Sequence, residues 1–562
     1  MEVFDRLVGL ETEYAVRYPE HQAGTQRPAF STMFQALLGA LRKRVPTAEV
    51  RHPLKIGLFM ANGGAVWSES AGVSAASGLV EGAIPECRGP RQVTLYQRAQ
   101  DRLLGDAAQA AFEGTPFFLV KNDRDSQGNA YGAQENYEAV VASGVGLWCY
   151  RLGLVLLAPA GVFVWLAFLL IIILCLAAMF GVLIVQAFRG ALTQKPVAAV
   201  NELPWLDSLI LWLVRIFLVP LAIPMWFFAW LLPFRRTRIA LTPFLASRSI
   251  FCGAGMLDEP DHFHLADKAG AINCVVGFGG LIFDRPLFSF GHFFKAICFD
   301  IFLVPRHYFD LFRARQRLQI NLGDSNMAEW AEYLRVGTTL LVLDAFEAGK
   351  LNPPFRLPRA LGALHRISRD STLKTKVRLT GGREWTALEI QRWYWEACHD
   401  FLRSTPGVPR EAWHVLEMWL DVLHALENQP ETLFGKVDWI TKQRLLVEAG
   451  TDAPWEARKK IDLRYHELSS GGYFQRLQLA GILPEIHTPE AIEQATRTPP
   501  SDSPAAVRGR YIREYADSSE SLRVGWHHLI LGRGRASRTI LLTRFRRLRE
   551  TPPDTATTLS DE

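Results

Sequence analysis

The feature that most constrains this chain is a long apolar stretch, residues 152–188, which contains no charged side chain. A second apolar run covers residues 208–233, with Arg215 as its one charged residue. About 20 apolar residues are enough to cross the hydrocarbon core of a bilayer, so each run is long enough to span a membrane. The two runs predict an inserted two-helix transmembrane hairpin within residues 146–240. The alternative is a pair of buried core helices, but uncharged runs of this length are rare in soluble domains.

Basic residues flank the outer ends of both runs. Arg151 precedes the first run, and Arg235, Arg236 and Arg238 follow the second. Because cytoplasmic flanks are enriched in Lys and Arg, we expect both outer ends in the cytoplasm. Two crossings return the chain to its starting side, as one folded domain interrupted by a hairpin requires. We therefore predict a multi-pass protein of the cytoplasmic membrane, with the lipid bilayer as one partner and a catalytic domain that faces the cytoplasm.

A third apolar stretch, from Val275 to Val304, is interrupted by charged residues that include Asp284, Lys295 and Asp300. Charges at this spacing predict an interfacial or core segment rather than another confident span. The start of the chain, MEVFDRLVGLETEYAV, lacks the basic region, apolar core and cleavage site of a signal peptide. We expect this end to stay in the cytoplasm.

Charge and cysteine content exclude two classes of protein. The 562 residues include 62 basic and 57 acidic side chains, for a formal net charge of +5. This balance is not typical of a nucleic-acid-binding protein, so we expect no nucleic-acid partner. The seven cysteines contain no CxxC pair. Their number is odd, which favours a reducing compartment without a disulfide framework or a zinc site.

The remaining segments have the patterns of a soluble α/β enzyme of more than one domain. Residues 317–322 alternate as a strand, and helices are predicted from about Met327 to Gly349, after the potential N-cap residues of GDSN, and over residues 386–403. The polar, Pro-rich residues 487–505 predict a linker. The predicted boundaries are 1–145 and 241–486 for two parts of one catalytic domain, 146–240 for the hairpin, 487–550 for a small C-terminal domain and 551–562 for a disordered tail.

Two glutamates lie two positions apart in the apolar sequence GLETEYAV, residues 9–16. Strand side chains alternate between faces, so the carboxylates of Glu11 and Glu13 point the same way. A half-exposed strand with a solvated acidic face would explain them. A divalent cation such as Mg²⁺ would also explain them, because hard ions bind carboxylate oxygens and hold them ionised.

Further polar clusters occur in a fixed order along the chain. They are NGGAVWSE (62–69), VEGAIPEC (80–87), KNDRDSQGNAYGAQENY (121–137), LTPFLASR (241–248), GDSN (323–326), VDWITK (437–442) and DLRYHEL (462–468). This ordered series resembles the Pup ligase and Pup deamidase family, the proteasome accessory factor A group. The resemblance covers nearly the whole chain outside residues 145–240 and roughly 275–312.

The resemblance implies an α+β fold, in which a glutamine-synthetase-like curved antiparallel sheet carries helices on one face. Family members use ATP and Mg²⁺ to phosphorylate the C-terminal Glu of Pup, a small disordered modifier, and a substrate lysine then forms an isopeptide bond. The implied metal ligands are Glu11, Glu13, Glu81 and Glu86. Glu69 stands where the family has its catalytic Asp. The implied nucleotide-binding residues are Asn136, Arg248, Arg317 and Trp439.

Several positions depart from the family pattern. Ala65 replaces an ATP-contacting Arg, Trp67 a metal-binding Tyr, Ile84 a Thr near the nucleotide and Gln134 a His. Two functions therefore stay open: an ATP-dependent ligase anchored in the membrane, or a non-catalytic relative that acts as a membrane-tethered binding or scaffold protein.

The choice between ligase and deamidase depends on local features. The segment between the first strand and the NGG motif is short, as in ligases, and CGAG and GDSNM also resemble ligases. Residues 367–377, ISRDSTLKTKV, are closer to the deamidase. We favour the ligase and keep a depupylase-type hydrolase as an alternative.

Overall fold

The chain forms two compact units. A computed structural model describes residues 2–19, 27–51, 56–70, 78–112, 116–124, 130–193, 212, 216, 221–258, 262–279, 284–450, 452–534 and 537–542. The first unit comprises Met1–Glu138, Ile239–Ile272 and Gln319–Glu562, and the second comprises Ala139–Arg238 and Asn273–Leu318. The second unit thus coincides closely with the two segments that lie outside the family resemblance.

A twisted run of strands organises the first unit. Along the sheet the order is β8-β1-β5-β4-β3-β2-β16-β17-β18. Their bounds are β1 (Leu7–Arg17), β2 (Thr47–Val50), β3 (Gly57–Met60), β4 (Ala65–Ser70), β5 (Gly78–Ala83), β8 (Gln134–Val140), β16 (Leu522–Val524), β17 (His528–Leu531) and β18 (Arg538–Leu541). An antiparallel sheet was predicted, and this is wrong for two pairs: β16 pairs with β2 in parallel, and so does β11 (Cys274–Gly277) with β12 (Pro286–Ser289). A mixed α+β sheet results.

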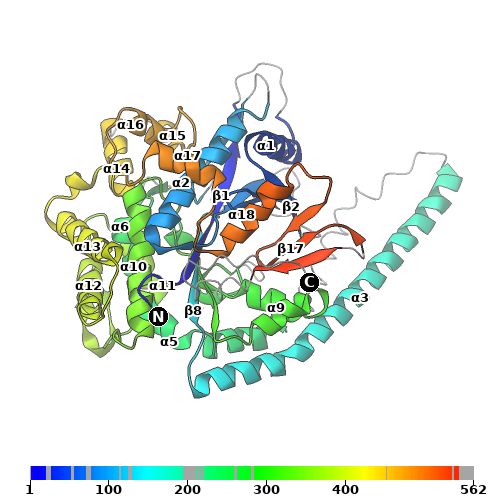
Figure 1. Cartoon of the computed structure of the whole chain (residues 1–562), viewed down its shortest axis with the longest axis horizontal. Coiled ribbons are helices and arrows are strands. Elements are labelled where there is room, and N and C mark those ends of the chain that lie inside the picture. Colours follow the sequence, from blue (N-terminus) through cyan, green and yellow to red (C-terminus); the bar gives the residue numbers. More distant parts are fainter. Residues whose placement is uncertain are drawn as a thin grey trace, which may run out of the picture. The chain divides into compact units, whose positions relative to one another are not determined.

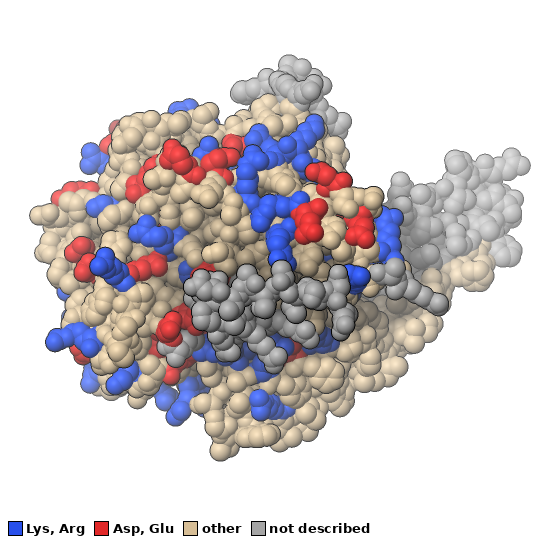
Figure 2. All heavy atoms as spheres, in the orientation of Figure 1, with Lys and Arg blue, Asp and Glu red and all other residues tan. Residues whose placement is uncertain are grey.

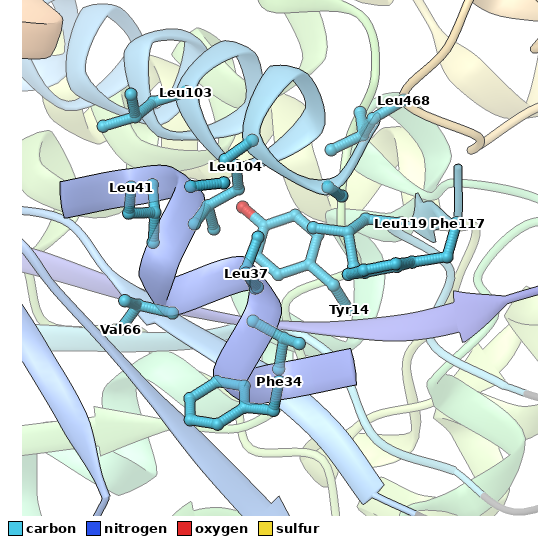
Figure 3. Packing of buried hydrophobic residues seen from close by; sticks show 14 of the residues in the cluster. Tyr14, Phe34, Leu37, Leu41, Val66, Leu103, Leu104, Phe117, Leu119 and Leu468 are labelled. Atoms are coloured by element: carbon cyan, nitrogen blue, oxygen red, sulfur yellow. The ribbon is translucent and has the colours of Figure 1, made fainter. Parts of the chain in front are cut away.

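Two helices cover one face of this sheet, α1 (Phe30–Arg44) and α2 (Gly89–Gln109). Figure 3 shows Tyr14 of β1 between Leu37 of α1 and Leu104 of α2, and all three side chains are fully buried. Val66 of β4 belongs to the same apolar cluster. Since strand side chains alternate, Glu11, Glu13 and the neighbours of Val66 must point to the opposite face. The opposite face carries Glu11 and Glu13 on β1, and farther along the sheet a second buried apolar cluster, in which Trp67 and Ala83 pack with C-terminal residues such as Ile512.

The predicted strand and helices of the central region are confirmed. β13 runs over Arg315–Ile320, α10 over Glu329–Glu347 and α12 over Ala387–Arg403. A capping box joins Thr386 to Glu389 at the start of α12. The expected capping of α10 by GDSN is wrong, because its N-cap is Ala328 and no side chain caps it.

The predicted linker at residues 487–505 is also wrong, because α17 (Pro489–Arg497) and the start of α18 (Pro504–Tyr515) occupy it. Each helix has Pro in its first turn, after a Thr or Ser whose side-chain oxygen accepts a backbone N–H. Proline tolerates the first turn of a helix because the N–H it lacks has no partner there. The predicted disordered tail, 551–562, lies outside the described residues.

The remaining elements complete the two units. They are β6 (Cys87–Arg88), β7 (Phe118–Val120), α5 (Arg235–Ser247), α6 (Ser249–Cys252), β9 (Met256–Asp258), β10 (His262–His264), α11 (Ala360–Ser368), β14 (Val377–Arg378), β15 (Glu384–Trp385), α13 (Arg410–Asn428), α14 (Asp438–Glu448), α15 (Trp455–Arg464) and α16 (Tyr473–Leu479), and in the second unit β11 (Cys274–Gly277), β12 (Pro286–Ser289), α7 (Gly291–Lys295), the π-helical turn η3 (Ala296–Asp300), α8 (Ile301–Leu303) and α9 (Pro305–Asp310).

The second unit contains the long helix α3 (Val145–Thr193; Figure 1). Its residues Val145–Leu174 are long and apolar enough to cross a membrane, and they are the one such helix in the described part of the chain. The second predicted span, 208–233, lies partly outside the described residues, and its described part contains a shorter apolar helix, Leu221–Leu231. The described surface of α3 is almost entirely free of charged side chains in Figure 2.

Candidate active site

A row of three buried side chains crosses the face of the sheet opposite α1 and α2, on three neighbouring strands. Trp67 of β4 stands opposite Glu81 of β5, and Glu81 stands opposite Glu13 of β1. Directly opposite residues of antiparallel strands project to the same face, with side chains in contact range. We call Trp67, Glu81 and Glu13 the acidic row. Two carboxylates that lie far apart in the sequence are therefore neighbours, as the family resemblance implied.

A second row lies one step along the strands. Glu11 stands opposite Ala83 on one side and Gln134 of β8 on the other, and Ala83 stands opposite Ala65. Gln134 is hydrogen-bonded to Gln319. Three of the four positions that depart from the family, Ala65, Trp67 and Gln134, thus lie on the same face as Glu11 and the acidic row.

Glu13 has unusual electrostatics for a surface-strand glutamate. Its side chain is buried, and Gly132 donates its backbone N–H to Oε2 at 2.8 Å. Burial raises the pKa of Glu13 to about 7, and the negative charges of Glu81 and Asp123 act in the same direction, while Lys268 opposes them. A divalent cation bound here would favour the ionised form of these carboxylates.

The donor atoms of this face suit magnesium in part. The carboxylate oxygens of Glu11 and Glu13 are the hard ligands that Mg²⁺ prefers. Glu81 differs, because the indole Nε1–H of Trp67 donates to its Oε2. An indole N–H is a donor only, so Trp67 cannot ligate a cation as a tyrosine oxygen would. No group of three or more His, Cys, Asp or Glu side chains is arranged to hold a metal within the described residues.

Glu69, the predicted base, is the last residue but one of β4 and projects to the same face. It is exposed and stands opposite Leu79 of β5, two residues along from Trp67. It is therefore a diagonal neighbour of Glu81, and the Cα atoms of such neighbours lie about 7–8 Å apart in an antiparallel pair. Residues 71–77, part of the long loop that follows, lie outside the described part of the chain.

Asn136 is the predicted nucleotide-binding residue that shares this face. It stands opposite Gly9 and lies two residues along β8 from Gln134, on the same face. Its Oδ1 is buried and has no hydrogen-bond partner within the described residues. Buried polar atoms are nearly always paired in folded proteins, so an unpaired acceptor at a site suggests that a ligand donor completes it.

Arg248 and Trp439 lie elsewhere in the first unit. Arg248 is fully buried, binds both carboxylate oxygens of Glu135 and donates to Thr339 Oγ1 at 2.7 Å. Glu135 alternates with Gln134, so it points to the other face of the sheet. The Trp439 indole N–H donates to the Ile250 carbonyl at 2.9 Å. The structure thus gives both side chains partners within the fold.

Glu86 and Arg317 are also not brought to the acidic row. Both carboxylate oxygens of Glu86 are bound by Arg508 of α18, whose guanidinium stacks over Trp526 at 4.6 Å. Arg317 is exposed on β13 and belongs to the second unit. Of the nine predicted residues, the structure places five on one face of the sheet. These are Glu11, Glu13, Glu69, Glu81 and Asn136.

Sequence reasoning missed a buried aspartate cluster behind Glu13. Asp324 accepts backbone N–H bonds from Ala254, Asp267 and Lys268 at 2.8–3.0 Å. Burial raises the pKa of Asp324 to about 7, and the carboxylate of Asp123 adds to the effect. These bonds tie together three loops of the first unit. Asp123 and Asp324 lie within the motifs quoted above. Asp267 and Lys268 lie in HLADK (264–268), outside those motifs, although its polar residues are a visible signal.

The mixed sheet, with helices on one face and the acidic row on the other, defines an α+β protein with a PafA-like fold. The family model described as Pup-ligase protein matches residues 6–530, and the chain belongs to this family. The solved complex of Pup and its ligase PafA has a TM-score of 0.66 at 21% identity and covers 97% of this chain and 92% of that one. PafA in complex with ADP has a TM-score of 0.59 at 20% identity, covering 95% and 96% of the two chains.

Curated relatives match parts of the chain. A Pup–protein ligase of Acidimicrobium ferrooxidans is 39% identical over 233 residues, which are 40% of this chain and 51% of the relative. A Pup deamidase/depupylase of Mycolicibacterium smegmatis is 32% identical over 318 residues, which are 54% of this chain and 59% of the relative. The matched segments therefore span between half and two thirds of these relatives.

Proposed function

We propose that this protein is a membrane-anchored, ATP-dependent ligase that joins the C-terminal Glu of a Pup-like modifier to substrate lysines. The observation that carries the proposal is the acidic row, with Glu11 and Glu69 beside it, in a chain of the Pup-ligase family. The ligase named among the relatives and the PafA–Pup and PafA–ADP complexes named among the solved structures support this choice over the depupylase.

The reaction that fits this face has two balanced steps. The γ-carboxylate of the modifier attacks the γ-phosphorus of ATP, which releases ADP and leaves an acyl phosphate. A lysine amine then attacks the acyl carbon, phosphate leaves, and one amine proton is removed. Glu11 and Glu13 would hold Mg²⁺, whose charge offsets that of the phosphate oxygens when it is bound. Glu69, near the end of β4, would accept the amine proton with its carboxylate.

Glu69 gives the sharpest test of this function. We expect Glu69→Gln to bind ATP as the wild type does and to lose isopeptide formation by about 100-fold or more, since a neutral amide cannot accept the amine proton. Glu69→Asp should keep part of the activity. Ligation of a labelled Glu-terminated Pup-like peptide, followed on a gel, measures the effect.

Glu49 provides the matched control. It is also an exposed glutamate on a strand, but it stands opposite Leu58, which in turn stands opposite Val66 of the helix-covered face. Glu49→Gln should therefore ligate at the wild-type rate. A wild-type rate for Glu69→Gln would mean that the base lies elsewhere.

A second candidate function is a non-catalytic, membrane-tethered binding protein. The contact between Trp67 and Glu81 favours it, because this donor competes with a cation for the carboxylate. Ala65 adds to this, since a methyl group can neither donate a hydrogen bond to phosphate nor offset its charge. Wild-type protein that neither binds nor hydrolyses ATP with a Glu-terminated peptide would select this function. Release of ammonia from a Gln-terminated peptide would instead select the deamidase.

The membrane anchor is supported by the exposure of α3. Only 28% of its most apolar window is buried, and side chains such as Leu156 and Leu166 are 70% and 61% exposed. The core helix of a soluble protein would be largely buried, and a continuous exposed apolar surface of this kind marks a membrane or protein interface. We propose that α3 and the run at 208–233 form the hairpin predicted from the sequence.

A further inference from the structure

Residues 291–310 of the second unit, which we call the interfacial segment, are fastened along the first half of α3. Gly161 of α3 permits close approach, because a Cβ there would lie 2.6 Å from the carbonyl oxygen of Ile297. The Tyr308 hydroxyl donates to the Leu154 carbonyl at 2.9 Å. Packing of this kind buries Leu154 completely. The segment is therefore a fixed part of the second unit and follows α3 wherever α3 lies.

The interfacial segment has a second, apolar side that the rest of the unit does not cover. Phe302, Leu303 and Phe309 are 54%, 60% and 66% exposed. Phe302 also contacts Trp165 of α3 edge to face at 6.2 Å, so its exposed side continues the apolar surface of α3. Three neighbouring large apolar side chains at this exposure need an apolar partner.

Polar groups of the segment lie in close pairs with one another and with Arg313 just beyond it. Asp310 accepts from Arg313 at 2.9 Å and lies 3.8 Å from Arg306, and His307 contacts Asp300 at 2.9 Å. Paired charges beside exposed aromatic side chains are typical of a helix that lies in the interface of a bilayer, with its apolar face in the acyl boundary and its polar face in water. Placing these charges in the hydrocarbon core would be unfavourable, and so would exposing the apolar side to water. The boundary between the two suits the segment better.

The length and shape of α3 leave room for such an arrangement. Its 49 residues would extend about 70 Å at about 1.5 Å per residue, more than twice the hydrocarbon thickness of about 30 Å. Pro159 lies within it, and α3 bends along its length in Figure 1. A proline removes one helical hydrogen bond and allows a bend. The part of α3 that contacts the interfacial segment extends at least to Trp165. This part can therefore lie along a membrane surface while the part beyond it crosses the bilayer.

Near the start of α3, aromatic and basic side chains have the composition of an interface. Trp148 is 70% exposed, and the Arg151 guanidinium lies 5.5 Å from its ring. Trp and Arg are enriched where a protein enters the headgroup layer, since both have an apolar body and a polar end. This composition favours lipid over a second protein chain as the occupant.

We propose that the start of α3 and the interfacial segment form an in-plane membrane-binding surface, in which Phe302, Leu303 and Phe309 insert into the headgroup layer of the bilayer. The proposal rests on the membrane anchor proposed above and adds a second attachment to it. The occupant is a phospholipid bilayer, and a second copy of the chain is the alternative that the experiment must separate.

Photo-crosslinking in nanodiscs tests the proposal with the full chain. The discs contain phosphatidylcholine and a phosphatidylcholine that carries a diazirine near its headgroup, and adducts are mapped by mass spectrometry. We expect adducts on peptides that cover residues 299–309 as well as on α3. The variant Phe302→Ser/Leu303→Ser/Phe309→Ser should lose the first set and keep the second. Phe309→Ser alone, at a position 66% exposed, should weaken the first set without affecting folding.

Two exposed apolar residues of the first unit are matched controls. Leu479 and Ile482 are 76% and 55% exposed, and we expect no adducts there. Adducts on α3 with none on residues 299–309 would overturn this proposal and leave the anchor in place. Adducts on neither would overturn both. Crosslinks between two chains from a photoreactive amino acid that replaces Phe309, in place of lipid adducts, would identify a second copy as the occupant and also overturn the proposal.

Discussion

Trp67 determines how the acidic row can act, because its indole N–H is directed at the carboxylate of Glu81. We predict that Mg²⁺ stabilises the folded Trp67→Phe variant more than it stabilises the folded wild type. The variant removes one donor from a buried carboxylate, which should cost about 1–3 kcal/mol in magnesium-free buffer. Mg²⁺ should restore most of this loss, since the cation then meets no competing donor. Thermal unfolding in detergent with and without Mg²⁺ measures both effects.

Trp526 serves as the control for this prediction. Its ring contacts that of Trp67 edge to face at 6.5 Å, so Trp526→Phe disturbs the same aromatic cluster. That variant should be destabilised equally with and without Mg²⁺. If Trp67→Phe behaves in the same way, the contact with Glu81 has no bearing on a cation.

At the residue scale, the sequence was informative where a local rule applies. Strand alternation alone places Glu11 and Glu13 on one face. The contact of Trp67 with Glu81 depends on the register between β4 and β5, and register is a property of the whole sheet that no short motif records. Arg248 was misleading for a related reason: its partner Glu135 lies next to Gln134 in the sequence but on the other face.

At the element scale, composition alone predicted a linker where two helices begin. Residues 487–505 are polar and rich in proline, which suggested a linker. Pro489 and Pro504 instead occupy the first turns of α17 and α18. The signal that favours helix starts is the Ser or Thr directly before each proline.

His487, next to the start of α17, predicts how stability changes with pH. Its side chain is buried, and burial lowers its pKa to about 4, with the charges of Arg91 and Arg98 acting in the same direction. The folded state therefore prefers neutral His487, and the ordinary pKa of 6.5 applies when the chain is unfolded. This contribution is fully present above pH 6.5 and is lost as the pH falls towards 4. Its size is on the order of 2–3 kcal/mol.

The variant His487→Gln cannot be protonated, so it should flatten this dependence. Melting temperatures at pH 7.5 and pH 4.5 give the comparison, and the wild type should lose more on acidification than the variant. His424, exposed on α13, is the control, and His424→Gln should follow the wild type. An equal acid loss in His487→Gln and wild type would contradict the prediction.

At the scale of the whole molecule, the insertion is larger than its apolar runs. Hydropathy alone identified residues 146–240, because a long uncharged run is visible without any alignment. Residues 273–318 belong to the same unit only through contacts such as that of Gly161 with Ile297. These contacts join positions that are far apart in the sequence. The sequence pattern could therefore predict an apolar segment within residues 273–318, but not that it packs against α3.

The last prediction concerns the topology of the inserted unit. Helix Leu221–Leu231 is closed at its end by Arg238, whose guanidinium donates to the carbonyls of Ala229, Trp230 and Pro233 at 2.8–3.1 Å. A cation that satisfies the last carbonyls of an apolar helix is suited to the point where the helix leaves the membrane.

We expect the chain to re-enter the cytoplasm at Arg238. Alkaline phosphatase inserted within residues 190–205 should then be active outside the cytoplasm, and the same enzyme fused after Glu562 should be inactive. The protein should stay with membranes through a carbonate wash. A cytoplasmic signal from the inserted reporter, or release by carbonate, would exclude the hairpin.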